Sequence, residues 1–246
     1  MRHIRRNERG QLTIGSHIAV DLAERFGTPL YVYSGDGLVA NYAAFASAVS
    51  ELDCVVHYAV KANSSLGVLG LLAQQGAGAD IVSGGEMKRA LFAGIVPDKI
   101  VFSGVGKTDN EIRAALQAGI AQINAESATE LRHISQIAAE TERQAPVALR
   151  VNVNVDPGSH AKISTGQRST KFGIPVADGE AAMLYRQLCS DPNLIPRGLA
   201  VHIGSQLRKL DPFERAYQEL LALADMLRAE GLDVPILDLG GGLGVN

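Results

Sequence analysis

The sequence is poor in cysteine and has no long hydrophobic runs. Its two cysteines, Cys54 and Cys189, lie far apart and form no C-x-x-C pair, so no disulfide framework is expected. This sparse use of cysteine fits a reducing, cytoplasmic compartment. No stretch approaches the roughly 18 consecutive apolar residues of a membrane-spanning helix, so we expect neither such a helix nor a membrane partner.

The sequence also lacks an excess of positive charge. Its 23 Lys and Arg residues stand against 26 Asp and Glu residues, which leaves a net charge of −3. A weakly acidic chain without basic runs has no electrostatic footprint for nucleic acid, so no nucleic-acid partner is expected. The basic residues between positions 2 and 9 are followed by no apolar segment, which argues against a secretory signal.

Short β-branched runs alternate with segments of helical spacing along the whole chain. This alternation predicts βαβ units and a parallel sheet, because parallel neighbours need a crossover connection. Expected strands from position 55 to 147 begin roughly 21–26 residues apart, close to the repeat of a (β/α)₈ barrel. We therefore favour an α/β fold of the (β/α)₈, TIM-type class, although a doubly wound sheet alternates in the same way. The expected strands are 30–33, 55–60, 79–82, 100–103, 121–124, 147–153, 199–203 and 236–239, and the expected helices are 64–75, 86–93, 110–118, 127–142, 177–190 and 213–230.

Two glycine-rich segments resemble nucleotide-binding loops but fail the patterns. Residues 103–108 (SGVGKT) follow an expected strand, yet the Walker A pattern needs glycine at position 101, which is Val101. Residues 240–244 (GGGLG) follow another, yet the Rossmann pattern begun at Gly240 needs glycine at position 245, which is Val245. NTP hydrolysis and dinucleotide binding are therefore weakly supported. A glycine-rich strand end can still bring backbone amides to a single phosphate.

Polar residues interrupt apolar runs near the ends of four expected strands, at Lys61, Asp80, Arg150 and His202. A single such residue is usually a satisfied core residue, and Lys61 could simply reach solvent. Four of complementary chemistry at one end of four strands favour a site, because unpaired burial would cost several kcal/mol each. At the mouth of a barrel, where catalytic residues collect, Lys61 would be a nucleophilic amine suited to Schiff-base formation.

Two further polar residues have both a structural and a functional interpretation. Glu86 completes an S/T-x-x-E capping box with Ser83, which is enough to explain it. Ser205 follows His202 where a strand turns toward a helix, so its hydroxyl could bind an anion or simply form the turn. Capping boxes are expected at Ser83–Glu86, Thr108–Glu111 and Ser127–Glu130.

Five motifs occur in the order found in one known family: YAVKAN at 58–63, GADIVSGGE at 78–86, ISTGQRSTKFGI at 163–174, HIGSQ at 202–206 and LDLGGGLG at 237–244. Over roughly residues 10–246 the sequence resembles the N-terminal part of the diaminopimelate decarboxylase family. These are decarboxylases dependent on pyridoxal 5'-phosphate (PLP), with the alanine-racemase-like fold. HIGSQ and the ISTGQRSTKFGI segment resemble this family more than they resemble ornithine decarboxylase.

The resemblance implies a role for each of the polar residues. It implies that Lys61 carries PLP covalently and that His202 stacks on the pyridine ring. The phosphate would be held by Ser205, Gly240, Gly241 and Gly242. Asp80, Glu86 and Arg150 would form the polar shell that orients lysine, histidine and cofactor. No metal site is expected, because the remaining histidines lack metal-ligand spacing.

The resemblance also implies a domain organisation. Residues 1–34 would associate with a second, β-rich domain, and residues 35–246 would form the PLP-binding barrel. From position 55 onward we count seven expected strands, whereas a closed barrel has eight. The family's Glu-Pro-Gly-Arg motif and C-terminal cysteine are not found, so we expect a truncated barrel that is inactive alone. The intact protein would be a homodimer.

The function implied for the full-length protein is decarboxylation of meso-2,6-diaminopimelate to L-lysine and CO₂, with an amino acid as the small-molecule substrate. A decarboxylase of other basic amino acids, such as ornithine or arginine, is the alternative enzyme. A non-catalytic PLP-binding relative is an alternative of a different class. A racemase of the same fold would share the lysine but not the HIGSQ and KFGI segments.

Overall fold

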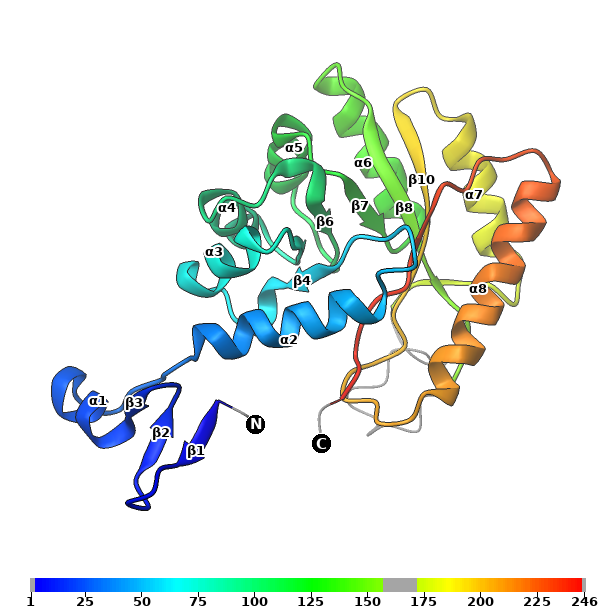
Figure 1. Ribbon diagram of the computed structural model, residues 1–246. Helices are drawn as coiled ribbons and strands as arrows, with labels where there is room; N and C mark the ends of the chain where they lie inside the picture. The colour runs from blue at the N-terminus through cyan, green and yellow to red at the C-terminus, as the bar shows by residue number, and fades with distance from the viewer. Residues whose placement is uncertain (1–2, 157–171, 245–246) are drawn as a thin grey trace. The chain divides into compact units, whose positions relative to one another are not determined.

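The chain divides into two compact units, which are described separately. The computed structural model describes residues 3–156 and 172–244 (Figure 1). The N-terminal unit comprises Met1–Asp80 and Gly85–Lys99, and the C-terminal unit comprises Ile81–Gly84 and Ile100–Asn246. Within the described residues, every helix is too short or too polar to cross a bilayer.

The N-terminal unit begins with a small antiparallel sheet that the sequence did not predict. Strand β1 (Ile4–Arg6) pairs with β2 (Leu12–Ile14), and β2 pairs with β3 (His17–Ile18). The turn between the first two strands is held by Asn7, whose Oδ1 accepts hydrogen bonds from the backbone N–H groups of Arg9 and Gln11. Helices α1 (Ala19–Phe26) and α2 (Gly35–Ala48) follow.

The predicted strand at residues 30–33 is wrong. These residues adopt no strand conformation, and their aromatic side chains are exposed, with Tyr31 at 85%. Aromatic and β-branched residues favour a strand only where a pleated neighbour is available to pack against. No strand pairs with this segment among the described residues, so its high β-propensity has no effect.

Two parallel strands and their crossover helix complete the N-terminal unit. Strand β4 (His57–Ala59) pairs with β5 (Gly78–Ile81), with Ala59 opposite Asp80. Between them lie a 3₁₀ turn, η1 (Val60–Ala62), and helix α3 (Leu66–Gln74), and helix α4 (Gly84–Phe92) and turn η2 (Pro97–Lys99) come after them. Apolar side chains of α2 and α3 pack together, namely Leu38, Tyr42, Val68 and Leu72.

The C-terminal unit is a parallel sheet in which the strands follow chain order. Its strands are β6 (Ile100–Phe102), β7 (Gln122–Ala125), β8 (Ala145–Asn152), β10 (Leu194–Val201) and β11 (Ile236–Asp238), and the two-residue β9 (Ile174–Pro175) pairs with β8. Helices α5 (Asp109–Ala118), α6 (Ala128–Glu140), α7 (Glu180–Ser190) and α8 (Asp211–Ala229) connect them (Figure 1). The predicted alternation of strand and helix is confirmed from position 55 onward.

Two of the three predicted capping boxes can be compared with the structure. The Thr108–Glu111 box is complete, because Thr108 Oγ1 accepts from Glu111 N and Glu111 Oε2 accepts from Thr108 N. Ser127 caps α6 through Glu130 N, but the Glu130 carboxylate turns instead to Lys107 Nζ and Glu126 N, at 2.9 and 2.7 Å. A buried lysine therefore takes the carboxylate that a reciprocal box would use. The Ser83–Glu86 box stays a prediction.

Tyr185 on α7 generates a prediction about alkaline stability. Its side chain is fully buried, and its hydroxyl donates to Asp233 O at 2.7 Å. Burial, followed by the charges of Cys189 and Asp233, raises the pKa of this phenol above its ordinary value of about 10. The unfolded chain therefore loses this proton first as the pH rises, so the free energy of unfolding falls above about pH 10.

We expect Tyr185→Phe to lower the free energy of unfolding at pH 7 by about 1 kcal/mol, the scale of one hydrogen bond. The variant should also lose less stability between pH 9 and pH 11 than the wild type, because the raised pKa is removed. Urea unfolding at several pH values measures both effects. Identical pH profiles for the two proteins would contradict the assignment.

Candidate functional site

The N-terminal unit places Lys61 directly after a parallel strand. Strand β4 ends at Ala59, and Lys61 is the middle residue of the 3₁₀ turn η1, where its side chain is exposed. The following segment is held by two hydrogen bonds, from Tyr58 Oη to Asn63 O at 3.4 Å and from Arg89 Nη1 to Ser64 O at 3.2 Å. The amine thus projects from a short, tethered turn rather than from the strand itself.

Asp80 and Glu86 lie in the same unit as Lys61. Asp80 is partly buried on β5 and is in register with Ala59, so it and Lys61 lie at the carboxyl ends of neighbouring parallel strands. Glu86 is partly buried in the first turn of α4. At the start of β5, a Cβ on Gly78 would lie 2.5 Å from His57 Cδ2 and 2.6 Å from Lys99 O, so close packing requires a glycine there.

The C-terminal unit holds Arg150 through a pair that the sequence did not predict. Arg150 Nη1 donates to Glu126 Oε1 at 2.8 Å, and the two side chains are only 12% and 5% exposed. The guanidinium carbon also lies 5.5 Å from the centroid of the Phe172 ring. Glu126 follows β7 within the segment NAES, at a strand end like the other polar residues, and this position is the signal that could have identified it.

A glycine loop after β11 lies directly against the end of β10. Gly240 has a φ of +68° and Gly242 a φ of +103°, in the left-handed region that favours glycine. A Cβ on Gly240 would lie 2.2 Å from Val201 O, and one on Gly242 would lie 1.8 Å from Gly204 O. The backbone approach therefore excludes any side chain at either position. Ser205, which is exposed, follows Gly204 in the turn after β10.

The loop and His202 are joined by hydrogen bonds. Gly240 N donates to Asp238 Oδ1 at 2.9 Å, and Gly241 N donates to His202 Nδ1 at 3.3 Å. Because Nδ1 accepts a hydrogen bond, the proton of the neutral imidazole lies on Nε2. Two of the three glycine N–H groups predicted to contact a phosphate are thus hydrogen-bonded within the protein.

The predicted residues are distributed over both units. Register pairing puts Arg150 opposite Ala200, so Arg150 and His202 lie near the carboxyl ends of the neighbouring strands β8 and β10. The C-terminal unit brings together the loop, His202 and Ser205. The N-terminal unit contains Lys61, Asp80 and Glu86. The ISTGQRSTKFGI segment lies largely outside the described residues.

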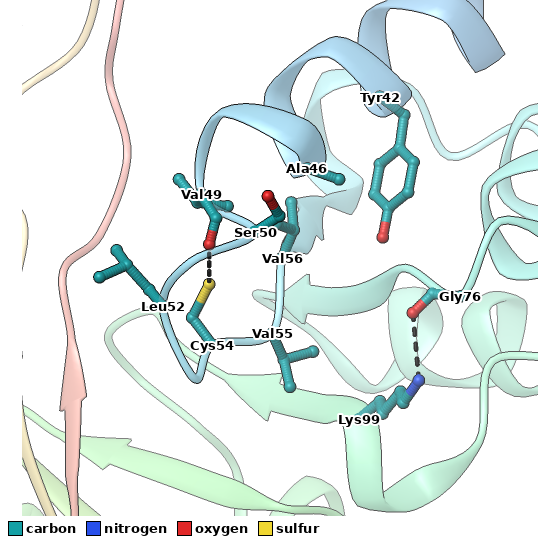
Figure 2. A pocket seen from close by; sticks show the side chains of 10 residues that line it. All are labelled: Tyr42, Ala46, Val49, Ser50, Leu52, Cys54, Val55, Val56, Gly76 and Lys99. Atoms are coloured by element: carbon teal, nitrogen blue, oxygen red, sulfur yellow. Dashed lines mark hydrogen bonds between the residues drawn. The ribbon is translucent and has the colours of Figure 1, made fainter.

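A surface pocket in the N-terminal unit contains none of these residues. It has a volume of about 240 Å³ and is lined by α2 and the chain that follows it, with Gly76 and Lys99 opposite (Figure 2). Two of its polar groups bind main-chain carbonyls: Cys54 Sγ donates to Val49 O and Lys99 Nζ donates to Gly76 O. Burial raises the pKa of Tyr42 on the same wall. This pocket shows no constellation of catalytic groups.

The chain is similar to a known family and to several solved structures. The family described as pyridoxal-dependent decarboxylase, pyridoxal binding domain, matches residues 36–246. Diaminopimelate decarboxylase of Vibrio cholerae is 50% identical over 238 residues, which cover 97% of this chain and 57% of that protein. Diaminopimelate decarboxylase of Helicobacter pylori, crystallised with L-lysine, superposes with a TM-score of 0.89 at 40% identity, covering 92% of this chain and 57% of the other.

A lysine decarboxylase is a more distant structural neighbour. The enzyme of Selenomonas ruminantium superposes with a TM-score of 0.82 at 27% identity, covering 98% of this chain and 57% of that one. The likeness to these structures confirms the predicted α/β barrel-type fold. The chain spans about 57% of the length of the relatives that it matches.

The buried Arg150–Glu126 pair generates a stability prediction. Glu126→Ala should lower the free energy of unfolding by about 3 kcal/mol, because the variant leaves a buried guanidinium without its counter-charge. Glu126→Gln should cost less, since an amide oxygen can still accept from Arg150. Denaturant unfolding measures both variants. Glu140→Ala removes the exposed pair with Arg113 and is the matched control, expected to change little; equal losses at both sites would contradict the account.

The glycine loop generates a stability prediction with a control in the preceding residue. Gly242→Ala should lower the free energy of unfolding by about 2 kcal/mol, because the added Cβ meets Gly204 O and the backbone is left-handed. Gly241→Ala should be tolerated, since no atom lies within 4 Å of a Cβ there. Thermal or chemical unfolding compares them, and a Gly242→Ala variant as stable as Gly241→Ala would refute the close packing.

Proposed function

Because the chain belongs to the pyridoxal-dependent decarboxylase family, matching its pyridoxal-binding domain over residues 36–246, we propose that it is the cofactor-binding part of a diaminopimelate decarboxylase. The complete protein would convert meso-2,6-diaminopimelate to L-lysine and CO₂. The observation that carries this proposal is the glycine loop packed on the end of β10, beside His202 and Ser205. The higher identity to diaminopimelate decarboxylases than to lysine decarboxylase supports the substrate.

The residues present fit PLP in their chemistry. An aldehyde needs an amine, which Lys61 offers from a tethered turn at a strand end. A phosphate needs N–H and O–H donors on a backbone that it can approach closely. The loop offers these, because Gly242 cannot carry a side chain and Ser205 is exposed beside it. Since Gly240 N and Gly241 N are already hydrogen-bonded, we assign the loop's phosphate contact to Gly242 N.

Each of these residues would contribute a separate part of the chemistry. When bound, PLP supplies an electron sink for the electron pair left when the α-carboxylate departs as CO₂. Lys61 would hold the cofactor covalently and release it when the substrate amine takes its place. His202 would lie against the ring with its proton on Nε2, as Gly241 N requires. Arg150, oriented by Glu126, would join Asp80 and Glu86 in the polar shell.

The wider organisation of the protein belongs to the same proposal. Residues 1–34 would associate with a second, β-rich domain, and their exposed aromatic residues Phe26, Tyr31 and Tyr33 are suited to such a contact. Residues 35–246 would form the PLP-binding barrel domain. The intact protein would act as a cytoplasmic homodimer. A decarboxylase of ornithine, arginine or lysine is the alternative enzyme, and a PLP-binding relative without activity is the alternative outside catalysis.

The test uses the complete protein incubated with PLP and then reduced with borohydride. Before reduction we expect a visible absorbance band, which borohydride should abolish, and mass spectrometry should then place the fixed adduct on Lys61. Lys61→Ala should lose both the band and the adduct, whereas the exposed Lys88→Ala should keep them. CO₂ and lysine release from meso-diaminopimelate then tests the substrate. An adduct elsewhere would overturn the site, and activity restricted to ornithine, arginine or lysine would overturn the substrate.

A further inference from the structure

Asp238 joins the glycine loop to the interior of the C-terminal unit. It is the last residue of β11 and is partly buried. Its Oδ1 accepts from Gly240 N at 2.9 Å, and its Oδ2 accepts from Asn124 Nδ2, also at 2.9 Å. Each carboxylate oxygen therefore has an N–H donor, one on the loop and one on a different strand.

The inner partner of Asp238 is itself fixed. Asn124 on β7 is 2% exposed, and its Oδ1 accepts from Gln122 Nε2 at 2.7 Å. Its Nδ2 also lies 3.1 Å from Ser103 Oγ. Strands β7 and β11 are not neighbours, since β8 and β10 lie between them in the sheet order. The Asn124–Asp238 hydrogen bond thus connects strands that the ladder does not join.

Leu239, the residue between Asp238 and the glycine loop, is held by a hydrogen bond from helix α8. Tyr217 on α8 donates its hydroxyl to Leu239 O at 3.2 Å. Burial and the nearby Asp238 charge raise the pKa of Tyr217, so the phenol keeps the proton that it donates. The chain entering the loop is therefore restrained at residues 239 and 240, and the following N–H of Gly241 is directed at His202.

We propose that Asp238 is a positioning residue for phosphate binding. Its carboxylate links Gly240 N to the buried Asn124 Nδ2 and so sets the orientation in which the loop receives the phosphate. This inference rests on the proposed PLP function. A carboxylate in contact with phosphate would repel it, so Asp238 acts through the loop, with its own charge directed at two N–H donors. The same hydrogen bonds orient the loop residue that contacts His202.

The test compares PLP with pyridoxal, which forms the same bond to Lys61 but carries no phosphate. In the complete protein, Asp238→Ala should weaken PLP binding about tenfold, the scale of one hydrogen bond to a charged group, and change pyridoxal binding little. Asp238→Asn keeps an oxygen for Gly240 but presents an amide to Asn124, so a loss of about threefold is expected. Absorbance titration measures both dissociation constants.

Controls separate a positioning role from a general loss of structure. Asp225→Ala removes an exposed carboxylate on α8, whose Arg228 partner is 3.4 Å away, and should leave both affinities unchanged. Equal weakening of PLP and pyridoxal, or no weakening of PLP, would overturn the role of Asp238. Should Asp238→Ala fail to fold, the same comparison with Asp238→Asn decides. If the wild-type protein forms no Lys61 adduct, both the proposed function and the role of Asp238 are refuted. If the wild-type protein forms the adduct but the Asp238 variant loses PLP and pyridoxal affinity equally, only the role of Asp238 is refuted.

Discussion

The close approach of two backbone segments at the carboxyl ends of β10 and β11 is the constraint on which the candidate site depends. Gly240 and Gly242 lie so near to Val201 O and Gly204 O that neither can carry a Cβ. The contact continues through Leu207, whose N–H donates to Gly242 O and whose carbonyl accepts from Gly244 N. A loop fixed in this way presents backbone donors at one edge of a parallel sheet, where ligands of α/β folds commonly bind.

Polar groups around this contact reinforce it from three directions. Asp238 ties the loop to Asn124, Tyr217 ties it to α8, and Gly241 N reaches His202. Arg150, on the strand beside His202, is oriented separately by the buried Glu126. Because these hydrogen bonds are present without a ligand, the loop is pre-organised, which lowers the entropic cost of binding.

The sequence predicted much of this because strand ends and periodicity are local features. The alternation of runs located the parallel strands from position 55. Asp80 and Arg150 lie near the carboxyl ends of their strands, and Lys61 and His202 lie just after theirs. The strand at 30–33 failed because local propensity does not supply a partner strand. The small sheet at residues 4–18 was missed because its strands are only two or three residues long.

Contacts between distant segments could not be predicted in the same way. Asp238 and Asn124 are separated by 114 positions and meet only after the sheet has formed. Glu130 matched a capping box, yet its carboxylate pairs with the buried Lys107 instead. A four-residue motif contains no information about such a distant partner. Tertiary hydrogen bonds of this kind decide which polar residues are held in a fixed orientation, and therefore which candidate residues can form a site together.

A crystal structure of the complete protein with PLP would show whether Lys61 and the glycine loop hold the cofactor. We expect continuous density from Lys61 Nζ to the cofactor, with phosphate oxygens about 3 Å from Gly242 N and Ser205 Oγ. His202 should lie against the ring, and Gly240 N should still donate to Asp238. A phosphate bound away from the glycine loop, or a cofactor joined to another lysine, would contradict the proposed site.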